Sequence, residues 1–281
     1  MTKLREAAYR LDPALWVREI VQVTPAPWQE SFLRAPLGVA ILALTARQVG
    51  KTTVASWGIA HSMIFSANSL SVIACPAQRQ SAEAVRRVRE ALLKAGQKLT
   101  SDNVYGLELG NGSRVLALPG SDDSIRGLTV DGWIIADEAA RLPEDLIAAL
   151  RPMRARRPQA RLAMLSTAWS RSDPFWTAWA SDDPSFIRLK ATADSSSELF
   201  APGFLEQERR ALGEHAFNRE YLGIPGGGEA SPFTWDLYEQ ATFIRVPKVP
   251  PGPAFAPPPA PKAVPLANPF QRVQPLVGGL Q

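Results

Sequence analysis

The sequence of 281 residues predicts an α/β fold, a mainly parallel sheet with helices on both faces. Short apolar runs alternate with longer helical segments, the pattern of buried parallel strands joined by crossover helices. The run Val39–Leu44 ends in a polar loop closed by Gly50-Lys51-Thr52, which is the layout of a phosphate-binding loop between a strand and a helix. Polar residues follow three of the expected strands, at the edge where such sheets bind phosphate ligands. These observations together predict a phosphate-binding sheet protein.

The N-terminal half supplies the first elements of this fold. Residues 13–34 have helical, amphipathic spacing, with Asp12 as N-cap, Pro13 in the first turn and a break at Thr24–Pro27. The elements expected next are strand Val39–Leu44, helix Lys51–Phe65, strand Leu70–Cys75, helix Ala77–Ala95, and a hairpin of Leu107–Leu109 and Arg114–Leu118 around Gly110-Asn111-Gly112.

The second half continues the alternation. The expected elements are strand Trp133–Ala136, helix Glu144–Leu150, strands Arg161–Leu165 and Phe186–Leu189, and one or two helices within Pro202–Tyr221. Gly226-Gly227-Gly228 then opens a segment in which ten of the 25 prolines fall between Pro247 and Pro269, a composition typical of disordered chain. The expected domains are an N-terminal helical segment (1–35), an ATPase core (36–200), a helical linker subdomain (201–225) and a disordered tail (226–281).

Composition narrows the function classes. With 46% hydrophobic residues the chain can build a core, and 31 Lys and Arg against 27 Asp and Glu give a formal net charge of +4, which is compatible with nucleic acid. One cysteine and two histidines make a disulfide framework or a His/Cys metal site improbable. No apolar run approaches 18 residues and no signal-peptide core is present, so we expect a protein of the cytoplasm with no membrane partner.

The phosphate loop assigns the first roles. Backbone N–H groups around Gly50 would surround phosphate oxygens, Lys51 would reach the β- and γ-phosphates, and the Thr52 hydroxyl would hold Mg²⁺. Such loops usually have glycine six residues before the lysine, where this chain has Thr45. The pattern predicts a P-loop NTPase of the RecA/ASCE-like kind.

Two acids follow the strand Trp133–Ala136. In phosphate-loop ATPases the first acid at a strand end holds Mg²⁺, the role expected for Asp137, and the second polarises the attacking water as general base, the role expected for Glu138. The alternative is a solvated acidic pair that caps the next helix.

Two further side chains are candidates for nucleotide contact. Arg47, inside the loop, is placed to neutralise charge on the γ-phosphate, or it is a surface arginine paired with a carboxylate. Gln29, beside Trp28, has an amide suited to an adenine edge, or it is a solvent-facing glutamine beside a core tryptophan.

Three other features have more open interpretations. Arg126, before Gly127, is placed to meet a neighbouring subunit or DNA, or it lies in a plain turn. Ser166 and Thr167, after a strand, suit sensing of the γ-phosphate or a helix N-cap. The basic cluster of Arg154, Arg156, Arg157 and Arg161 is a solvated face or a DNA contact.

These motifs together resemble those of the large terminase subunits of tailed bacteriophages, the ATP-driven motors that package DNA into procapsids. The resemblance covers about residues 25–240 and is specific because the order and spacing of the motifs agree. The matching segments are Pro27–Gln29 (adenine glutamine), Ala46–Thr53 (a deviant phosphate loop that often lacks the first glycine), Ser124–Gly127 (Arg-Gly loop), Ile134–Ala140 (Walker B), Leu165–Ala168 (coupling motif), Phe217–Gly223 (end of the ATPase part) and Phe233–Trp235 (linker).

The resemblance implies a DNA-translocating ATPase with ATP and Mg²⁺ as cofactors. It implies nucleotide contacts by Gln29, Gln48, Gly50, Lys51, Thr52, Thr53, Ser166 and Thr167, Mg²⁺ on Thr52 and Asp137, and catalysis by Glu138, Arg47 and Arg126. The implied partners are double-stranded DNA, further copies of the chain in a ring on a portal, and the small terminase subunit, in the cytoplasm of a bacterial host.

The sequence departs from the family's pattern near its C-terminus. The family usually continues into a nuclease whose clustered aspartates hold two metals, but after Asp236 this chain has Glu239 as its only acid. We therefore expect no nuclease activity from this chain. Two alternatives stay open: a catalytically idle or domesticated prophage fragment that binds DNA or acts as a scaffold, and a helicase-type ATPase.

Overall fold

A computed structural model describes residues 3–118 and 127–226. All of these belong to one compact unit. The expected disordered tail therefore falls outside the described residues, apart from Gly226 at its beginning.

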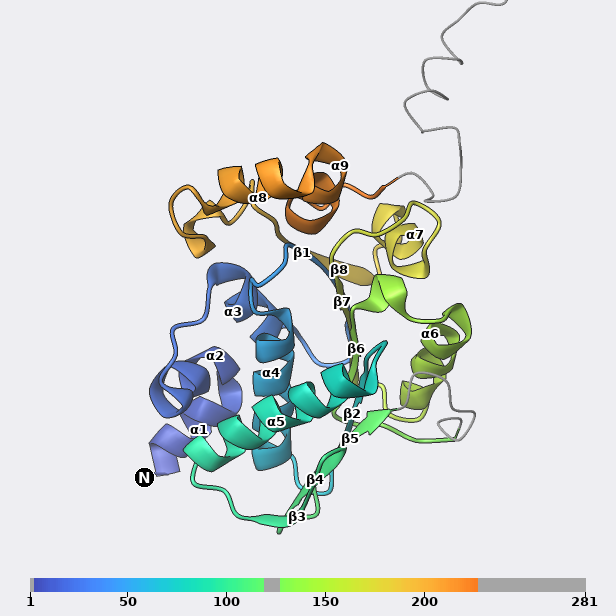
Figure 1. The fold of residues 1–281 in the computed structure, drawn as a ribbon. Helices are drawn as coiled ribbons and strands as arrows, with labels where there is room; N and C mark the ends of the chain where they lie inside the picture. The colour runs from blue at the N-terminus through green and yellow to red at the C-terminus, as the bar shows by residue number, and fades with distance from the viewer. Residues whose placement is uncertain (1–2, 119–126, 227–281) are drawn as a thin grey trace, which may run out of the picture. The chain divides into compact units, whose positions relative to one another are not determined.

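An eight-stranded sheet forms the middle of this unit, as Figure 1 shows. The strands are β1 (Ala40–Thr45), β2 (Leu70–Ala74), β3 (Leu99–Asn103), β4 (Gly106–Leu109), β5 (Arg114–Leu118), β6 (Trp133–Asp137), β7 (Arg161–Ser166) and β8 (Phe186–Ala191). Their order across the sheet is β3-β4-β5-β2-β6-β7-β1-β8. In the run β5-β2-β6-β7-β1-β8 each strand pairs in parallel with its neighbour. At the other edge, β4 pairs antiparallel with both β3 and β5. The predicted mainly parallel sheet is confirmed.

The register of the parallel strands brings their carboxyl ends to one edge. Leu44 of β1 lies opposite Ser166 of β7, and Asp137 of β6 lies opposite Leu165 of β7. Loops that leave neighbouring parallel strands therefore meet at this edge, which positions the candidate site.

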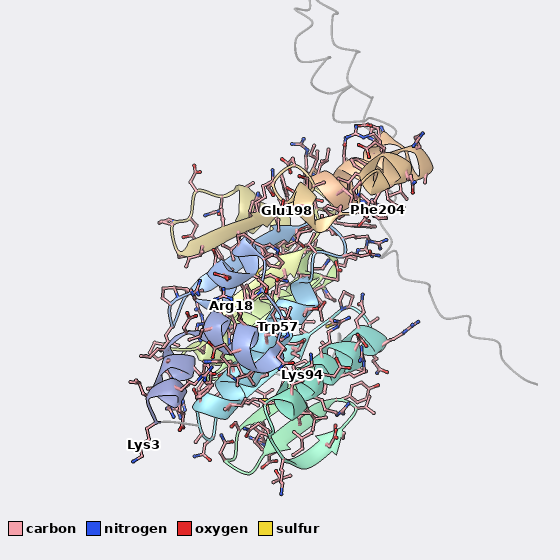
Figure 2. All side chains as sticks on the ribbon, turned by 90° about the vertical axis from the view of Figure 1, so that its left-hand side faces the viewer. Lys3, Arg18, Trp57, Lys94, Glu198 and Phe204 are labelled. Carbon is pink, nitrogen blue, oxygen red and sulfur yellow. The ribbon has the colours of Figure 1, made fainter. Side chains whose placement is uncertain are left out.

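The two faces of the sheet bury separate cores because side chains alternate along a strand. In β1, Ile41 and Ala43 belong to one core and Leu42 and Leu44 to the other. The first core lies under five helices, α1 (Lys3–Leu11), α2 (Pro13–Trp16), α3 (Pro27–Leu33), α4 (Lys51–Phe65) and α5 (Gln78–Lys94), with a π-helical turn at Val17–Val21. Figure 2 turns this helical layer toward the viewer, with Trp57 of α4 and Lys94 of α5 within it.

Helix α4 is buried on most of its surface, which explains why its sequence is apolar all round rather than amphipathic. It lies between the sheet and the N-terminal helices. At Gly58 an added Cβ would come within 3.2 Å of the Trp133 ring, so a small residue allows helix and sheet to approach closely. The ring of Phe32 in α3 stacks on the Trp133 ring, with 5.0 Å between the two ring centroids.

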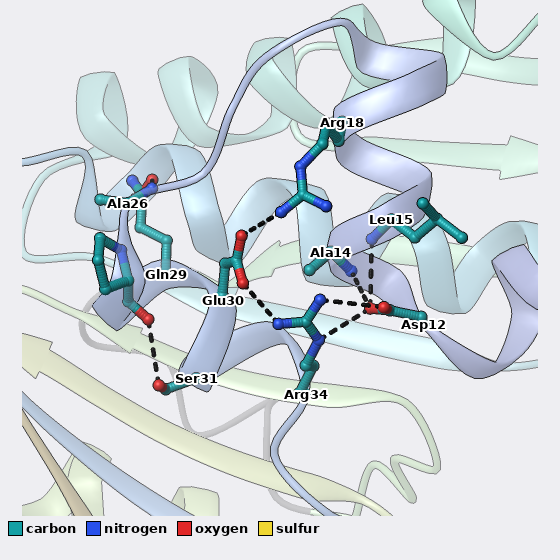
Figure 3. Close-up of polar contacts among 10 residues, drawn as sticks. Asp12, Ala14, Leu15, Arg18, Ala26, Gln29, Glu30, Ser31 and Arg34 are labelled. Atoms are coloured by element: carbon teal, nitrogen blue, oxygen red, sulfur yellow. Dashed lines mark hydrogen bonds and ion pairs between the residues drawn. The ribbon is translucent and has the colours of Figure 1, made fainter.

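The N-terminal helices are joined by charged side chains. Asp12 caps α2 by accepting from the backbone N–H groups of Ala14 and Leu15, as predicted. Figure 3 shows the same carboxylate paired with Arg34, which also pairs with Glu30 of α3. This network fixes the start of α2 against α3, the helix that carries Gln29.

The second face is covered by a shorter set of helices. These are the 3₁₀ turn Ala139–Arg141, α6 (Glu144–Leu150), the 3₁₀ turn Arg151–Arg154 and α7 (Pro174–Ala180). Their buried residues, such as Leu146, Leu150 and Phe175, pack on the second core. Both faces of the sheet are therefore covered, as predicted.

After β8 the chain returns to the side of the first core. A 3₁₀ turn at Ser197–Leu199 is followed by α8 (Phe204–Leu212), α9 (Glu214–Phe217) and a π-helical turn, Asn218–Leu222. Phe217 and Tyr221 are buried and stack with 5.2 Å between ring centroids. Two elements, α7 and the edge strand β3, were not predicted, and α1 lies in the expected N-terminal helical segment but was not expected as a separate helix. Strand β3 has mostly exposed polar residues, so its sequence lacks the alternation that predicts strands, and pairing with β4 defines it.

Candidate nucleotide site

The loop between β1 and α4 has backbone geometry that its sequence explains. Gly50 has φ +87°, a region that favours glycine, and a Cβ there would meet Nε2 of Gln29 at 2.6 Å. Thr45, in place of the usual glycine, is the fully buried last residue of β1, and its Oγ1 donates to the backbone O of Ser166 at 3.4 Å. Because φ at Thr45 is not positive, threonine fits there without strain.

Lys51 is the first residue of α4 and its side chain is buried. Its Nζ lies 3.0 Å from Oε1 of Glu138, so a cation from the phosphate loop meets an acid from the end of β6. A buried ammonium needs a negative partner, and Glu138 supplies one here. A phosphate group at the loop would be a competing partner for Lys51. Glu138 itself has φ +54°, an uncommon conformation for a residue with a side chain.

A second contact joins the residue after Lys51 to the residue before Glu138. Thr52 Oγ1 donates to Oδ2 of Asp137 at 2.5 Å. Burial raises the pKa of the Asp137 carboxyl, while the nearby Lys51 cation and the Thr52 hydrogen bond oppose that rise. A divalent cation beside Asp137 would favour the ionised carboxylate in the same way as Lys51 does.

Magnesium is a fitting ion for these two oxygens. Mg²⁺ prefers oxygen ligands, and it usually takes one or two from the protein and the rest from phosphate and water. Thr52 and Asp137 supply such a pair, with 2.5 Å between Oγ1 of Thr52 and Oδ2 of Asp137. In residues 3–118 and 127–226, no three His, Cys, Asp or Glu side chains gather as a complete protein metal site. A cation here would therefore depend on ligands that arrive with it.

A pocket of about 360 Å³ opens beside these contacts. Its walls combine residues of the loop, β6 and the start of α5: Thr52, Cys75, Arg79, Gln80, Glu83, Arg87, Asp137 and Glu138. The Thr53 hydroxyl is fixed from this side, since Nη1 of Arg87 donates to it at 3.0 Å. Acids and arginines therefore line one pocket at the carboxyl edge of the sheet.

Gln29 is buried against the phosphate loop. Its Nε2 donates to the backbone O atoms of Val49 (3.4 Å) and Gly50 (3.3 Å), and its Oε1 accepts from the backbone N of Ala26 at 2.9 Å. The open alternative of a solvent-facing glutamine is wrong, because only 7% of the residue is exposed. Both ends of the amide have protein partners in this structure, so its contact with adenine stays a prediction.

Arg47 and Gln48 lie on the exposed side of the loop. The Arg47 guanidinium is paired with a carboxylate, because its Nε lies 3.1 Å from Oε2 of Glu220. Gln48 has φ +61°, and its side chain makes no hydrogen bond within the part of the chain that the structure describes. The roles of both at a nucleotide stay predictions.

Ser166 and Thr167 end the neighbouring strand β7 and are buried. Ser166 Oγ accepts from the backbone N of Ala140, which lies just after Glu138, at 3.2 Å. The strand that carries the predicted coupling motif is thus tied to the segment after the acids. Arg126, the remaining candidate, lies outside the described residues.

The basic cluster divides into two kinds of residue. Arg154 Nη1 donates to the backbone O of Gly38 at 2.8 Å, and Arg161 Nε donates to the backbone O of Ala35 at 3.0 Å. Burial lowers the pKa of Arg161 to about 10. These two side chains serve the fold, which leaves Arg156 and Arg157 exposed as candidates for DNA contact.

Sequence reasoning missed three side chains around the site. Glu220 was part of a matching segment but received no role, although an arginine in the loop needs a counter-charge. Arg87 lies in the helix expected at Ala77–Ala95 but received no role. Cys75 was expected at a strand end, and burial, with the nearby Asp137 charge, raises the pKa of its thiol to about 12. Only spatial proximity connects these residues with the loop.

Residues 42–240, more than half of the chain, match the family model described as terminase large subunit, T4likevirus-type, N-terminal. The chain belongs to this terminase large-subunit family. The resemblance inferred from the motifs is therefore confirmed. No curated protein matches the chain.

Solved structures of large terminases have the same fold. The Thermus phage P74-26 large terminase ATPase domain is 20% identical with a TM-score of 0.65, and the match covers 76% of this chain and 98% of that domain. The HK97 bacteriophage large terminase is 17% identical with a TM-score of 0.64, covering 80% of this chain and 56% of that one. The large terminase of the thermophilic bacteriophage D6E, in complex with ATP-gamma-S, is 16% identical with a TM-score of 0.56. This terminase chain spans about half the length of the HK97 and D6E proteins.

None of the helices in residues 3–118 and 127–226 is both long and apolar enough to cross a membrane.

Proposed function

We propose that this terminase chain binds ATP with Mg²⁺ at the β1–α4 loop and hydrolyses it to drive DNA packaging. One observation carries the proposal: Lys51 and Thr52 of the loop contact Glu138 and Asp137 at the end of β6. Phosphoryl transfer to water requires a cation that binds phosphate, oxygen ligands for a metal ion and a carboxylate that acts as base.

Each residue has a role that follows from its position. Lys51 binds the β- and γ-phosphates, with the backbone N–H groups near Gly50 and the positive end of the α4 dipole. Thr52 and Asp137 would hold Mg²⁺, which would neutralise charge on the phosphates. The Glu138 carboxylate separates from Lys51, because a phosphate group replaces it as the partner of the Lys51 ammonium. Glu138 can then accept a proton from the attacking water.

The remaining candidates support these four. Gln29 contacts the loop through Val49 and Gly50, and in our proposal its amide also meets adenine. Gln48 and Thr53 contact the nucleotide as part of the loop. Ser166 and Thr167 sense the γ-phosphate at the end of β7. Arg47 acts within its own subunit and Arg126 acts across a subunit interface.

The whole motor extends beyond this site. We propose that residues 36–200 form the ATPase core, 1–35 the segment that carries the adenine contact, and 201–225 a linker subdomain. The D6E terminase was solved with ADP and with ATP-gamma-S, which supports nucleotide binding by its relatives. Double-stranded DNA, a ring of copies on a portal and the small subunit are the proposed partners, in the cytoplasm of the host cell.

Hydrolysis by single variants tests the proposal. Lys51→Ala is expected to abolish ATP binding and hydrolysis, because it removes the cation for the phosphates. Glu138→Gln is expected to retain binding and to lose about 10²-fold or more in turnover, because an amide cannot act as a base. Phosphate release and binding of a fluorescent ATP analogue are measured on the same preparations.

Lys190→Ala is the matched control, since Lys190 is a half-exposed lysine that pairs with Asp194 on β8 and its loop. It is expected to hydrolyse ATP at the wild-type rate. Wild-type turnover by Glu138→Gln would show that Glu138 is not the base. Undiminished nucleotide binding by Lys51→Ala would show that nucleotide binds elsewhere.

A further inference from the structure

Glu220 is a buried carboxylate held directly against the phosphate loop. It lies in the π-helical turn Asn218–Leu222 and is 6% exposed. Its backbone O accepts from the backbone N of Arg47 at 2.9 Å, so the chain positions are fixed independently of the side chains. The two side chains therefore meet because the backbones of the loop and the turn are joined.

Three guanidinium groups surround the Glu220 carboxylate. Nε of Arg47 lies 3.1 Å from Oε2, while Nη2 of Arg141 and Nε of Arg219 lie 3.6 Å and 3.8 Å from Oε1. Despite its proximity to Arg47, Oε2 accepts no aligned hydrogen bond from any described residue. The pair with Arg47 is thus electrostatic and loosely oriented, and the Arg47 side chain is 56% exposed.

The other two arginines are fixed by an aromatic ring. The guanidinium carbons of Arg141 and Arg219 lie 4.2 Å and 4.0 Å from the ring centroid of Trp169, which follows the β7 strand end. Stacking of this kind stabilises a cation where it stands. If Arg47 leaves, Glu220 still has two cations near its other oxygen, so the buried charge is not left uncompensated.

We propose that Glu220 is a positioning residue that competes with the γ-phosphate for Arg47 and thereby lowers the selectivity for ATP over ADP. This inference rests on the proposed function, because it needs nucleotide at the loop. ATP offers a γ-phosphate that can replace Glu220 as the partner of Arg47, whereas ADP offers none. ATP binding therefore includes the cost of separating Arg47 from Glu220, and ADP binding does not.

The ratio of two dissociation constants measures this competition. Glu220→Gln removes the charge that competes for Arg47 and is expected to tighten binding of ATP-γ-S about three- to fivefold, the range for one partly exposed ion pair. Binding of ADP is expected to stay unchanged. In an Arg47→Ala background the same substitution is expected to change neither constant, since no arginine remains to be released.

Two further variants separate positioning from folding. Glu214→Gln removes an exposed acid that pairs with Arg209 in the same helical segment, and it is expected to leave the ratio at the wild-type value. Glu220→Asp keeps the buried charge but shortens its reach, so it is expected to shift the ratio in the same direction as Glu220→Gln even if that variant does not fold.

The outcomes distinguish the inference from the proposed function. An unchanged ratio in folded Glu220→Gln or Glu220→Asp protein would overturn the role of Glu220 alone. An equal shift in the Arg47→Ala background would do the same, because the effect would not pass through Arg47. Failure of the wild-type chain to bind ATP-γ-S at all would overturn the proposed function, and the inference with it.

Discussion

A partly buried histidine gives a prediction whose magnitude follows from the structure. His61 lies on α4, and its Nε2 is 2.8 Å from the backbone O of Tyr9 in α1. Its ring packs between Trp16 and Phe65, with centroid distances of 5.6 Å and 4.6 Å. Burial lowers the pKa of His61 from 6.5 to about 4, against the opposing hydrogen bond to Tyr9. The folded protein therefore prefers neutral His61.

The sign of the pH dependence follows from this lowered pKa. The unfolded chain takes up a proton on His61 as the pH falls through 6.5, while the folded chain resists until about 4. The contribution of neutral His61 to stability is therefore complete above 6.5 and is lost toward 4. The two pKa values correspond to a loss of about 2 kcal/mol in the free energy of unfolding from about pH 8 to about pH 5.

Urea denaturation at several pH values between these limits measures the effect. The difference between wild-type protein and His61→Gln is the readout, because carboxylates that titrate in both proteins cancel. The wild type is expected to lose about 2 kcal/mol more than the variant toward the acidic limit. His215→Gln, at the only other histidine and on an exposed site, is the control and is expected to follow the wild type. Parallel curves for wild type and His61→Gln would refute the reasoning.

Three further predictions concern the loop and its surroundings. Gly50→Ala is expected to lower the free energy of unfolding by about 2 kcal/mol, from positive φ and the clash with Gln29, and to weaken ATP binding; an unchanged melting temperature would contradict the close approach. Mixtures of Arg126→Ala with Lys51→Ala subunits are expected to recover turnover if Arg126 acts on a neighbour, since Lys51→Ala subunits still offer that arginine; no recovery in confirmed assemblies would place Arg126 in its own subunit. The purified chain is expected not to cut DNA with Mg²⁺ or Mn²⁺, and metal-dependent cleavage that survives Asp137→Ala would overturn that expectation.

Local patterns were sufficient to predict most of the fold. The bounds expected for α4, α6 and β5 agree with the structure, and those for α5 and the other parallel strands differ by one or two residues. These elements have clear start and stop residues and either an apolar period or, in α4, a sequence that is apolar all round, so each is determined mainly by its own sequence. The strand β3 lacks such signals and is defined by pairing with β4, whereas α1 has an amphipathic sequence that was not recognised as a separate helix.

The sequence alone was also sufficient to identify the phosphate loop and the two acids, because these sites are defined by residue types that lie close together in the chain. The sequence shows that Lys51, Asp137 and Thr167 each lie at or after the end of a strand. Because these strands are parallel, their ends lie at one edge of the sheet. The sequence could not determine the partners of these residues. The pairing of Arg47 with Glu220 joins positions that the sequence sets far apart, and the burial that lowers the pKa of His61 arises from helices folded over it. Such contacts depend on how the helical layers pack on the sheet, and only the tertiary structure decides them.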